Sequence, residues 1–253
     1  MAVQVYFIGA GPGDPELLTI KGKSIIERAD VIIYADSLIS PEICQFARHD
    51  AEIHRSASLS LEEITDIIEK AVRQGKLVAR LQSGDPTIYG AIQEQMVALE
   101  KRGIEYKIIP GVSSLFAAAA SLKTELTIPE ICQTVILTRM EGETPVPVLE
   151  SLKSLATHES TMAIFLSATL INEVVAALVE CGYSSETPAA VVYRATWEDE
   201  VVIRAPLKHL AERVKELGIK KQAIILVGNF LAQQTKGRRS RLYGKEKKGG
   251  FRS

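Results

Sequence analysis

LQSGDPTIYG, residues 81–90, follows an apolar strand pattern at 77–80 and leads into a helical pattern at 88–102. A Gly-Asp-Pro turn at the carboxyl end of a strand is a place where open α/β sheets build ligand sites. Gly84 lets a ligand approach the backbone, Pro86 ends the strand, and Asp85 supplies a fixed negative charge. Asp85 is equally suited to capping the helix that follows. The stretch therefore predicts an α/β fold and leaves two roles open for Asp85.

Strand and helix patterns alternate along the first half of the chain. Expected strands cover 3–8, 31–34, 52–54, 76–80 and 105–109, and expected helices cover 16–28, 43–47, 61–73 and 88–102. Ser60 is the expected N-cap of the helix at 61–73, with Glu63 as its capping-box partner. This alternation predicts a parallel sheet that helices cover on both faces.

A second alternating series follows the small-residue helix at 115–120. Its expected strands cover 134–138, 162–166, 189–193, 201–203 and 223–227, and its expected helices cover 148–156, 170–181 and 206–217. We therefore predict two α/β domains, at 1–114 and 115–235, followed by a basic and disordered tail at 236–253.

The formal charge of -1 conceals an uneven distribution. The tail at 236–253 holds eight of the 30 Lys and Arg residues and one of the 31 acids, so its charge is +7 and that of 1–235 is 22 minus 30, or -8. Nucleic-acid binding depends on clustered Lys and Arg that neutralise phosphates. The acidic body therefore argues against a nucleic-acid groove as the main function.

Cysteine and histidine usage indicates neither disulfides nor a metal site. Cys44, Cys132 and Cys181 form no CxxC pair and lie in apolar surroundings, so we expect buried free thiols in a reducing compartment. The four histidines lack metal-ligand spacing. The N-terminal sequence lacks a secretory pattern, and no long apolar run suits a membrane span. We expect a cytoplasmic protein with no bound metal and no membrane contact.

The loop GAGPGDPELLT, residues 9–19, is similar to a dinucleotide fingerprint but does not complete it. Gly9 and Gly11 are followed by Asp14, where GxGxxG requires a third glycine. Pro12 has no amide to donate, and the charge of Asp14 would repel a pyrophosphate. We therefore expect a rigid loop suited to a ligand without phosphates. A nucleotide-dependent oxidoreductase and a non-catalytic binding module remain as alternatives.

Several segments together resemble the tetrapyrrole methylase family, whose members transfer methyl groups from S-adenosylmethionine. They are GAGPGDPELLT (9–19), RLQSGDPTIYGAIQEQ (80–95), PGVSSLFAAAA (110–120), ELTIPEICQTVILTR (125–139) and VVYRATWEDE (191–200). The resemblance is strongest to the branch of the family that methylates C11 of precorrin-4 or of its cobalt form. It implies two α/β domains with the active-site cleft between them, and a homodimer. Methylation of another ring carbon is the nearest alternative.

The resemblance also implies a set of ligand contacts. The expected cofactor contacts are Pro12, Ser83, Gly84, Asp85, Ile88, Ser113, Ser114, Leu166, Ala195 and Ala223. The implied tetrapyrrole carries several carboxylates, for which arginine is a natural partner. The arginine candidates are Arg55, Arg80, Arg139 and Arg194.

Three aspects of the implied site stay open at this point. No residue stands out as a general base, so the catalytic assignment is left unknown. The sequence does not indicate whether the substrate carries cobalt, because that metal would be bound by the ring and not by residues of the chain. Glu143 occupies a position where we would expect arginine in relatives, which puts carboxylate binding by its loop in doubt.

Overall fold

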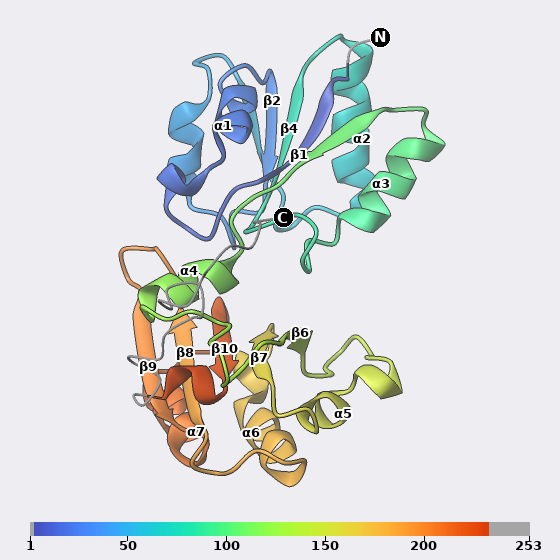
Figure 1. Cartoon of the computed structure of the whole chain (residues 1–253). Coiled ribbons are helices and arrows are strands. Elements are labelled where there is room, and N and C mark those ends of the chain that lie inside the picture. The colour runs from blue at the N-terminus through green and yellow to red at the C-terminus, as the bar shows by residue number, and fades with distance from the viewer. Residues whose placement is uncertain (1–2, 233–253) are drawn as a thin grey trace, which may run out of the picture. The chain divides into compact units, whose positions relative to one another are not determined.

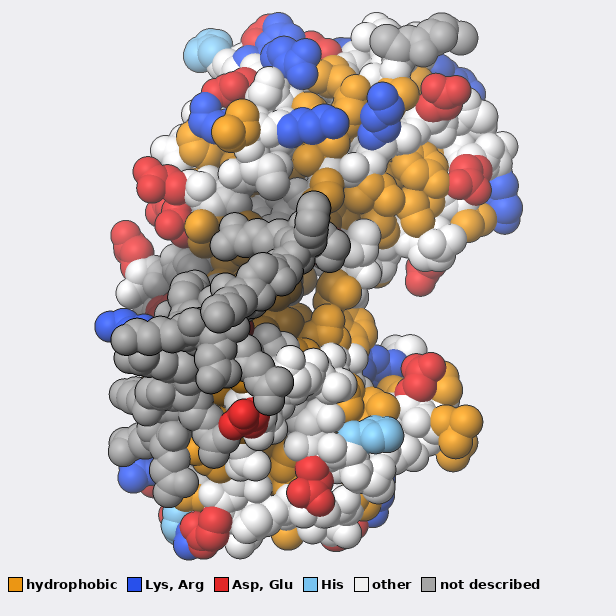
Figure 2. All heavy atoms as spheres, viewed as in Figure 1, with side chains coloured by type: hydrophobic (Ala, Val, Ile, Leu, Met, Phe, Trp, Pro, Cys, Tyr) orange, Lys and Arg blue, Asp and Glu red, His pale blue; other side chains and the backbone are white. Residues whose placement is uncertain are grey.

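A computed structural model describes residues 3–232, and the tail predicted at 236–253 lies outside the described residues. The described residues divide into two compact units, one of residues 3–117 with Arg194–Asp199 and one of residues 118–193 with 200–232. The segment Arg194–Asp199, which the sequence analysis placed in the second domain, thus belongs to the first unit. Charged side chains of both signs are interspersed with apolar ones on the visible face of each unit (Figure 2).

The first unit is built on a five-stranded sheet of order β3-β2-β4-β1-β5, in which every pairing is parallel. Its strands are β1 (Val5–Gly9), β2 (Val31–Tyr34), β3 (Glu52–Arg55), β4 (Val78–Gln82) and β5 (Tyr106–Ile109). Its helices are α1 (Ile20–Ile26), α2 (Leu61–Arg73) and α3 (Ile92–Lys101), with 3₁₀ turns η1 (Pro15–Leu17) and η2 (Pro41–Phe46).

Alternate residues of these strands enter two separate cores. Ile8, Ile32 and Leu81 pack with residues of α1, whereas Phe7 and Ile33 pack on the opposite face with residues of α2 and α3. Figure 1 shows α1 on one side of this sheet and α2 with α3 on the other. The predicted parallel sheet with both faces covered is therefore confirmed.

The helix at 61–73 has the predicted bounds, and its capping box is present. Ser60 accepts from the Glu63 amide, and the Glu63 carboxylate accepts from the Ser60 amide. The helix expected at 16–28 is instead η1 followed by α1, because Leu18 is extended and Thr19 caps a new helix. The helix expected at 88–102 begins only at Ile92.

The second unit contains a sheet of order β6-β7-β10-β8-β9, in which β6 and β7 are parallel and the other pairings are antiparallel. Its strands are β6 (Val135–Arg139), β7 (Thr161–Phe165), β8 (Pro188–Tyr193), β9 (Val201–Pro206) and β10 (Ala223–Val227). Its helices are α5 (Leu152–Ala156), α6 (Ile171–Glu180) and α7 (Leu207–Glu216), with 3₁₀ turns η3 (Val148–Glu150), η4 (Ala168–Leu170) and η5 (Asn229–Leu231). Helix α4 (Ser114–Ser121) spans the division between the units.

One core joins α5, α6 and α7 to the second sheet, and Met162, Ile164 and Val191 are among its strand residues. Cys44, Cys132 and Cys181 are free but half-buried, so the expected full burial was wrong. Among residues 3–232, no group of His, Cys, Asp and Glu side chains is arranged to hold a metal ion. Within the same range, no helix has both the length and the apolar character needed to cross a membrane.

Candidate functional site

Three glycines meet at the carboxyl edge of the first sheet. Gly9 ends β1, Gly84 follows β4, and Gly111 follows β5. A Cβ added to Gly111 would lie 2.2 Å from the Gly84 carbonyl oxygen and 2.6 Å from the Gly9 Cα. No other residue fits that junction without moving backbone. Gly84 also has a φ of +64°, which glycine adopts without strain.

Backbone hydrogen bonds fasten the loops after β1 and β4 to each other. The Ala10 amide donates to the Gln82 carbonyl at 2.7 Å, and the Gly84 amide donates to the Gly11 carbonyl at 2.8 Å. The Gly11 amide in turn donates to the Gly84 carbonyl at a longer distance of 3.3 Å. The two expected ligand loops thus form one rigid, backbone-lined floor, which we call the glycine floor and define by Gly9, Gly11, Gly84 and Gly111.

Within the glycine floor, Asp85 ties the loop after β4 to the loop after β5. Its Oδ1 accepts from the Thr87 amide at 2.9 Å and from the Thr87 hydroxyl at 2.6 Å, while its Oδ2 accepts from the Gly111 amide at 2.9 Å. Partial burial alone would raise the pKa of this carboxyl, but these bonds outweigh burial and lower it. Asp85 does not cap α3, which starts after Ala91 without a side-chain cap. The capping role left open by the sequence is therefore wrong.

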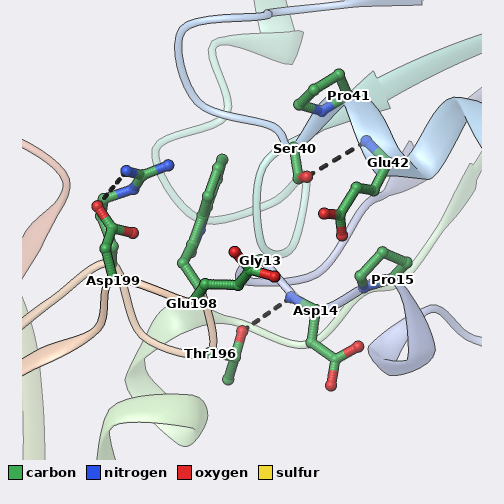
Figure 3. Close-up of a pocket in the computed structure, with 11 residues that line it drawn as sticks. Gly13, Asp14, Pro15, Ser40, Pro41, Glu42, Thr196, Glu198 and Asp199 are labelled. Atoms are coloured by element: carbon green, nitrogen blue, oxygen red, sulfur yellow. Dashed lines mark hydrogen bonds and ion pairs between the residues drawn. The ribbon is translucent and has the colours of Figure 1, made fainter.

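The segment Arg194–Asp199 packs on the glycine-rich loop within the first unit. The Trp197 indole donates to the Pro12 carbonyl at 2.9 Å, and the Asp14 amide donates to the Thr196 hydroxyl at 3.0 Å, as Figure 3 shows for the second bond. Trp197 lies so close to Gly13 that a Cβ there would be 2.3 Å from the ring. Sequence reasoning assigned neither Thr196 nor Trp197, and the signal available was that Trp197 is the single tryptophan of the chain.

A pocket of about 500 Å³ opens between this segment, the glycine-rich loop and η2 (Figure 3). Its walls carry four carboxylates and one guanidinium. The charged lining residues are Asp14, Glu42, Glu198, Asp199 and Arg194. Arg194 is paired with Asp199 and stacks over the Trp197 ring at 3.9 Å, so the remaining lining is acidic. Such a pocket disfavours phosphate groups.

Two of the helix amides that would hold a pyrophosphate are already occupied by side chains. The Asp14 carboxylate accepts from the Glu16 amide at 2.8 Å, and the Thr19 hydroxyl accepts from the Gly22 amide at 3.1 Å. A dinucleotide site needs those first-turn donors free and facing the ligand. The structure therefore supports the interpretation that this loop is no phosphate cradle.

The predicted cofactor contacts fall into two groups. Those of the first unit are Pro12, Ser83, Gly84, Asp85, Ile88, Ser113, Ser114 and Ala195. The loops that carry Pro12, Gly84 and Ser113 are brought together, since a Cβ on Gly84 would lie 3.6 Å from the Ser113 Cα. Leu166 and Ala223 belong to the second unit. Extending the β7–β10 register by two residues beyond Ile164 and Ile225 places them opposite each other.

The four arginine candidates differ in what their side chains already bind. Arg55 ends β3 at an exposed position. Arg139 donates to the carbonyls of Thr144 at 3.0 Å and Pro145 at 2.9 Å, and so holds the loop that carries the exposed Glu143.

Two of the candidates are engaged within the first unit. Arg194 makes the contacts with Asp199 and Trp197 described above. Arg80 is only 5% exposed and bonds to Gln95 and Ser56, and burial lowers its pKa to about 10. A guanidinium so enclosed is not available to a ligand carboxylate, which contradicts the direct role expected for Arg80.

Comparison with known proteins agrees with this architecture. The family profile of Tetrapyrrole (Corrin/Porphyrin) Methylases matches residues 4–211. A curated relative from Methanocaldococcus jannaschii, named cobalt-precorrin-4 C(11)-methyltransferase, is 60% identical over 228 residues, which are 90% of this chain and 88% of the relative.

Two solved structures extend the comparison. The X-ray structure of a cobalamin biosynthetic enzyme, cobalt precorrin-4 methyltransferase, superposes with a TM-score of 0.87 at 49% identity, covering 90% of this chain and 95% of the other. A uroporphyrin-III C-methyltransferase from Thermus thermophilus, complexed with S-adenyl homocysteine, superposes with a TM-score of 0.75 at 25% identity, covering 90% and 98%. The chain therefore belongs to the tetrapyrrole (corrin/porphyrin) methylase family.

Proposed function

We propose that this protein transfers a methyl group from S-adenosylmethionine to C11 of cobalt-precorrin-4, a step of cobalamin biosynthesis. The observation that carries the proposal is the 60% identity, over 90% of the chain, to a relative named for that reaction. The structure with 49% identity bears the corresponding name. Metal-free precorrin-4 is the alternative substrate form, and another ring carbon is the alternative target.

The glycine floor fits the proposed cofactor. Its glycines present backbone without side chains, the Asp85 carboxylate is bonded to its Gly111 amide, and the nearby pocket is acidic. S-adenosylmethionine carries no phosphate and has a positively charged sulfonium, so it needs no anion cradle and is compatible with neighbouring carboxylates. The related structure with S-adenyl homocysteine supports the choice of cofactor. We therefore assign the cofactor contacts to the loops after β1, β4 and β5, including Pro12, Gly84 and Ser113.

The residues of the floor would act by binding and orientation. The cofactor supplies an electrophilic methyl group, which an electron-rich ring carbon takes by in-line displacement, and correct positioning can supply most of the acceleration. Asp85 holds the Gly111 amide and the turn at Thr87, and so keeps the floor in one conformation. Ser83, Ile88, Ser114 and Ala195 are proposed as further contacts from the first unit, and Leu166 and Ala223 from the second.

The proposed substrate would bring several carboxylates to the protein. Arg55, Arg139 and Arg194 remain candidates for binding these carboxylates. Arg55 is exposed, whereas the guanidinium groups of Arg139 and Arg194 already make the bonds described above. Arg80 is left out because its guanidinium is enclosed. No general base is assigned.

Calorimetric titration of the purified protein tests the class of cofactor. We expect S-adenosylmethionine and S-adenosylhomocysteine to bind and NADH to give no heat of binding, because the first-turn amides are capped. Binding of NADH alone would indicate instead that the protein is a nucleotide-dependent oxidoreductase. Binding of the first two without turnover of any precorrin would favour a non-catalytic binding module.

We also propose that the protein works as a cytoplasmic homodimer. The family resemblance supports the dimer, and the free cysteines support a reducing compartment. Light scattering coupled to size-exclusion chromatography tests the first part, and a mass equal to one chain would contradict it.

A further inference from the structure

A buried chain of hydrogen bonds leads from Arg80 to the loop after β4. The Arg80 Nε donates to the Gln95 Oε1 at 2.9 Å, and its Nη1 donates to the Ser56 hydroxyl at 2.9 Å. Its Nη1 also lies 3.4 Å from the Ile33 and Leu81 carbonyl oxygens, so all four partners are neutral, and within residues 3–232 no carboxylate forms an ion pair with Arg80. A buried cation is costly unless its donors are satisfied, so these bonds hold Arg80 and its partners in one arrangement.

Gln95 connects Arg80 to the backbone just before α3. It is 6% exposed, and while its Oε1 accepts from Arg80, its Nε2 donates to the Ala91 carbonyl at 3.2 Å. Ala91 is the residue that precedes α3, and it has a φ of +48°. The side-chain amide therefore accepts one hydrogen bond and donates another, and a carboxylate at the same position could not donate.

The turn held in this way has an unusual backbone. Tyr89 has a φ of +53°, and the left-handed region is a genuine outlier for a bulky residue. Gly90 lies between Tyr89 and Ala91, and a Cβ there would be 2.2 Å from the Pro86 carbonyl oxygen. Strained conformations of this kind persist where the surroundings fix them, and they gather at functional sites. The bonds from Gln95 and the contact with Pro86 supply that fixation.

The turn continues the loop that carries Gly84, Asp85 and Ile88. Tyr89 is 43% exposed there, next to residues assigned above to cofactor binding. We propose that Tyr89 contacts the tetrapyrrole ring, and that Arg80 and Gln95 are positioning residues that hold Tyr89 in the required conformation. An aromatic ring packs well against the face of a large unsaturated macrocycle. This inference rests on the proposed function.

The test compares three variants with the wild type. Tyr89→Phe keeps the ring, Tyr89→Ala removes it, and Gln95→Glu keeps an acceptor for Arg80 but loses the donor to Ala91. Gln93→Glu is the matched control, since it places the same change on an exposed position of the same helix. The measurements are the melting temperature, hydrogen exchange of peptides spanning residues 86–92, affinity for S-adenosylhomocysteine, and kcat and KM with cobalt-precorrin-4.

Tyr89→Ala should raise KM for the tetrapyrrole by roughly threefold to tenfold, the size of one aromatic contact, with Tyr89→Phe close to wild type. Gln95→Glu should speed hydrogen exchange at 86–92, raise KM and lower the melting temperature by about 2–4 °C, because one lost hydrogen bond costs about 1 kcal/mol, whereas Gln93→Glu should change none of these. Affinity for S-adenosylhomocysteine should be unchanged in Gln93→Glu and should fall in Gln95→Glu, because the loosened segment 86–92 includes Ile88, a proposed cofactor contact.

An unchanged KM in Tyr89→Ala would overturn the contact, and unchanged exchange in Gln95→Glu would overturn the positioning role. A wild type that does not methylate any precorrin-4 would instead overturn the proposed function and the substrate contact with it. Hydrogen exchange would still decide whether Gln95 holds the turn, so the two failures are distinguishable.

Discussion

Asp85→Asn tests how the glycine floor is held. The substitution is nearly isosteric, and its remaining oxygen can still accept from Thr87. The asparagine NH₂ group then faces the Gly111 amide. In the wild type this amide donates to Oδ2 at 2.9 Å, so the substitution removes that bond. Thr87→Val is the matched control, because it removes the hydroxyl bond to Oδ1 and leaves the Gly111 bond in place.

The magnitude follows from the bonds that are lost. A hydrogen bond to a charged group contributes about 1.5–3 kcal/mol, and the Gly111 amide is partly buried, so about 2 kcal/mol is expected for Asp85→Asn. That loss corresponds to a melting temperature lower by about 4–8 °C for a domain of this size. Thr87 is exposed, so water replaces its bond, and we expect a change within about 0.5 kcal/mol for Thr87→Val.

Loosening of the glycine floor should also weaken cofactor binding. If Gly111 and Gly84 separate, affinity for S-adenosylhomocysteine should fall by about tenfold, which is about 1.4 kcal/mol. Scanning calorimetry gives the stability, and isothermal titration gives the affinity. If Asp85→Asn melts and binds like Thr87→Val, the Gly111 bond does not stabilise the floor and the reasoning is wrong.

The pH dependence provides a second readout of Asp85. Its pKa in the folded chain is lower than the ordinary value of 3.8, because accepted hydrogen bonds outweigh the effect of burial. The ionised carboxylate therefore stabilises the fold above pH 3.8, and this contribution is lost as the pH falls through the lowered pKa. The stability difference between wild type and Asp85→Asn should be constant near neutral pH and shrink in that acid range. A difference that grows on acidification would contradict the assignment.

Three further substitutions follow from the same structure. Gly111→Ala would place a Cβ 2.2 Å from the Gly84 carbonyl oxygen, so it should destabilise the chain by roughly 3 kcal/mol in urea titrations, and wild-type stability would contradict the close approach. Trp197→Phe removes the indole bond to Pro12 and should cost about 1 kcal/mol in the same assay, whereas an unchanged midpoint would show that this bond contributes nothing. Ser60→Ala removes one half of the capping box and should cost about 1 kcal/mol by calorimetry, and a change near zero would count against the cap.

Local signals made much of the first unit predictable. Helix α2 is bounded by a cap and a capping box that are written into residues 60–63, and β2 is a short β-branched run followed by a turn. The loop at 9–19 was predicted to be a rigid loop without a phosphate cradle, because Asp14 and Pro12 are incompatible with one. Each of these features depends on residues that are near one another in the sequence.

What the sequence could not reveal depends on distant contacts. Trp197 reaches the Pro12 carbonyl across 185 positions, and Arg80 finds Ser56 and Gln95 only once β4 is paired and covered. The late start of α3 depends on the left-handed backbone of Tyr89, which no propensity favours. The mixed second sheet was likewise not apparent, since alternating strands and helices fit parallel and mixed sheets alike.

The position of the transferred methyl group tests the central claim most directly. Cobalt-precorrin-4 and metal-free precorrin-4 would each be incubated with the protein and with S-adenosylmethionine labelled with ¹³C in its methyl group, and the products analysed by mass spectrometry and NMR. The account predicts one added methyl, bonded to C11, with the cobalt form as the better substrate. A label on another ring carbon would contradict the assigned reaction, and no transfer to either form would contradict the proposed function.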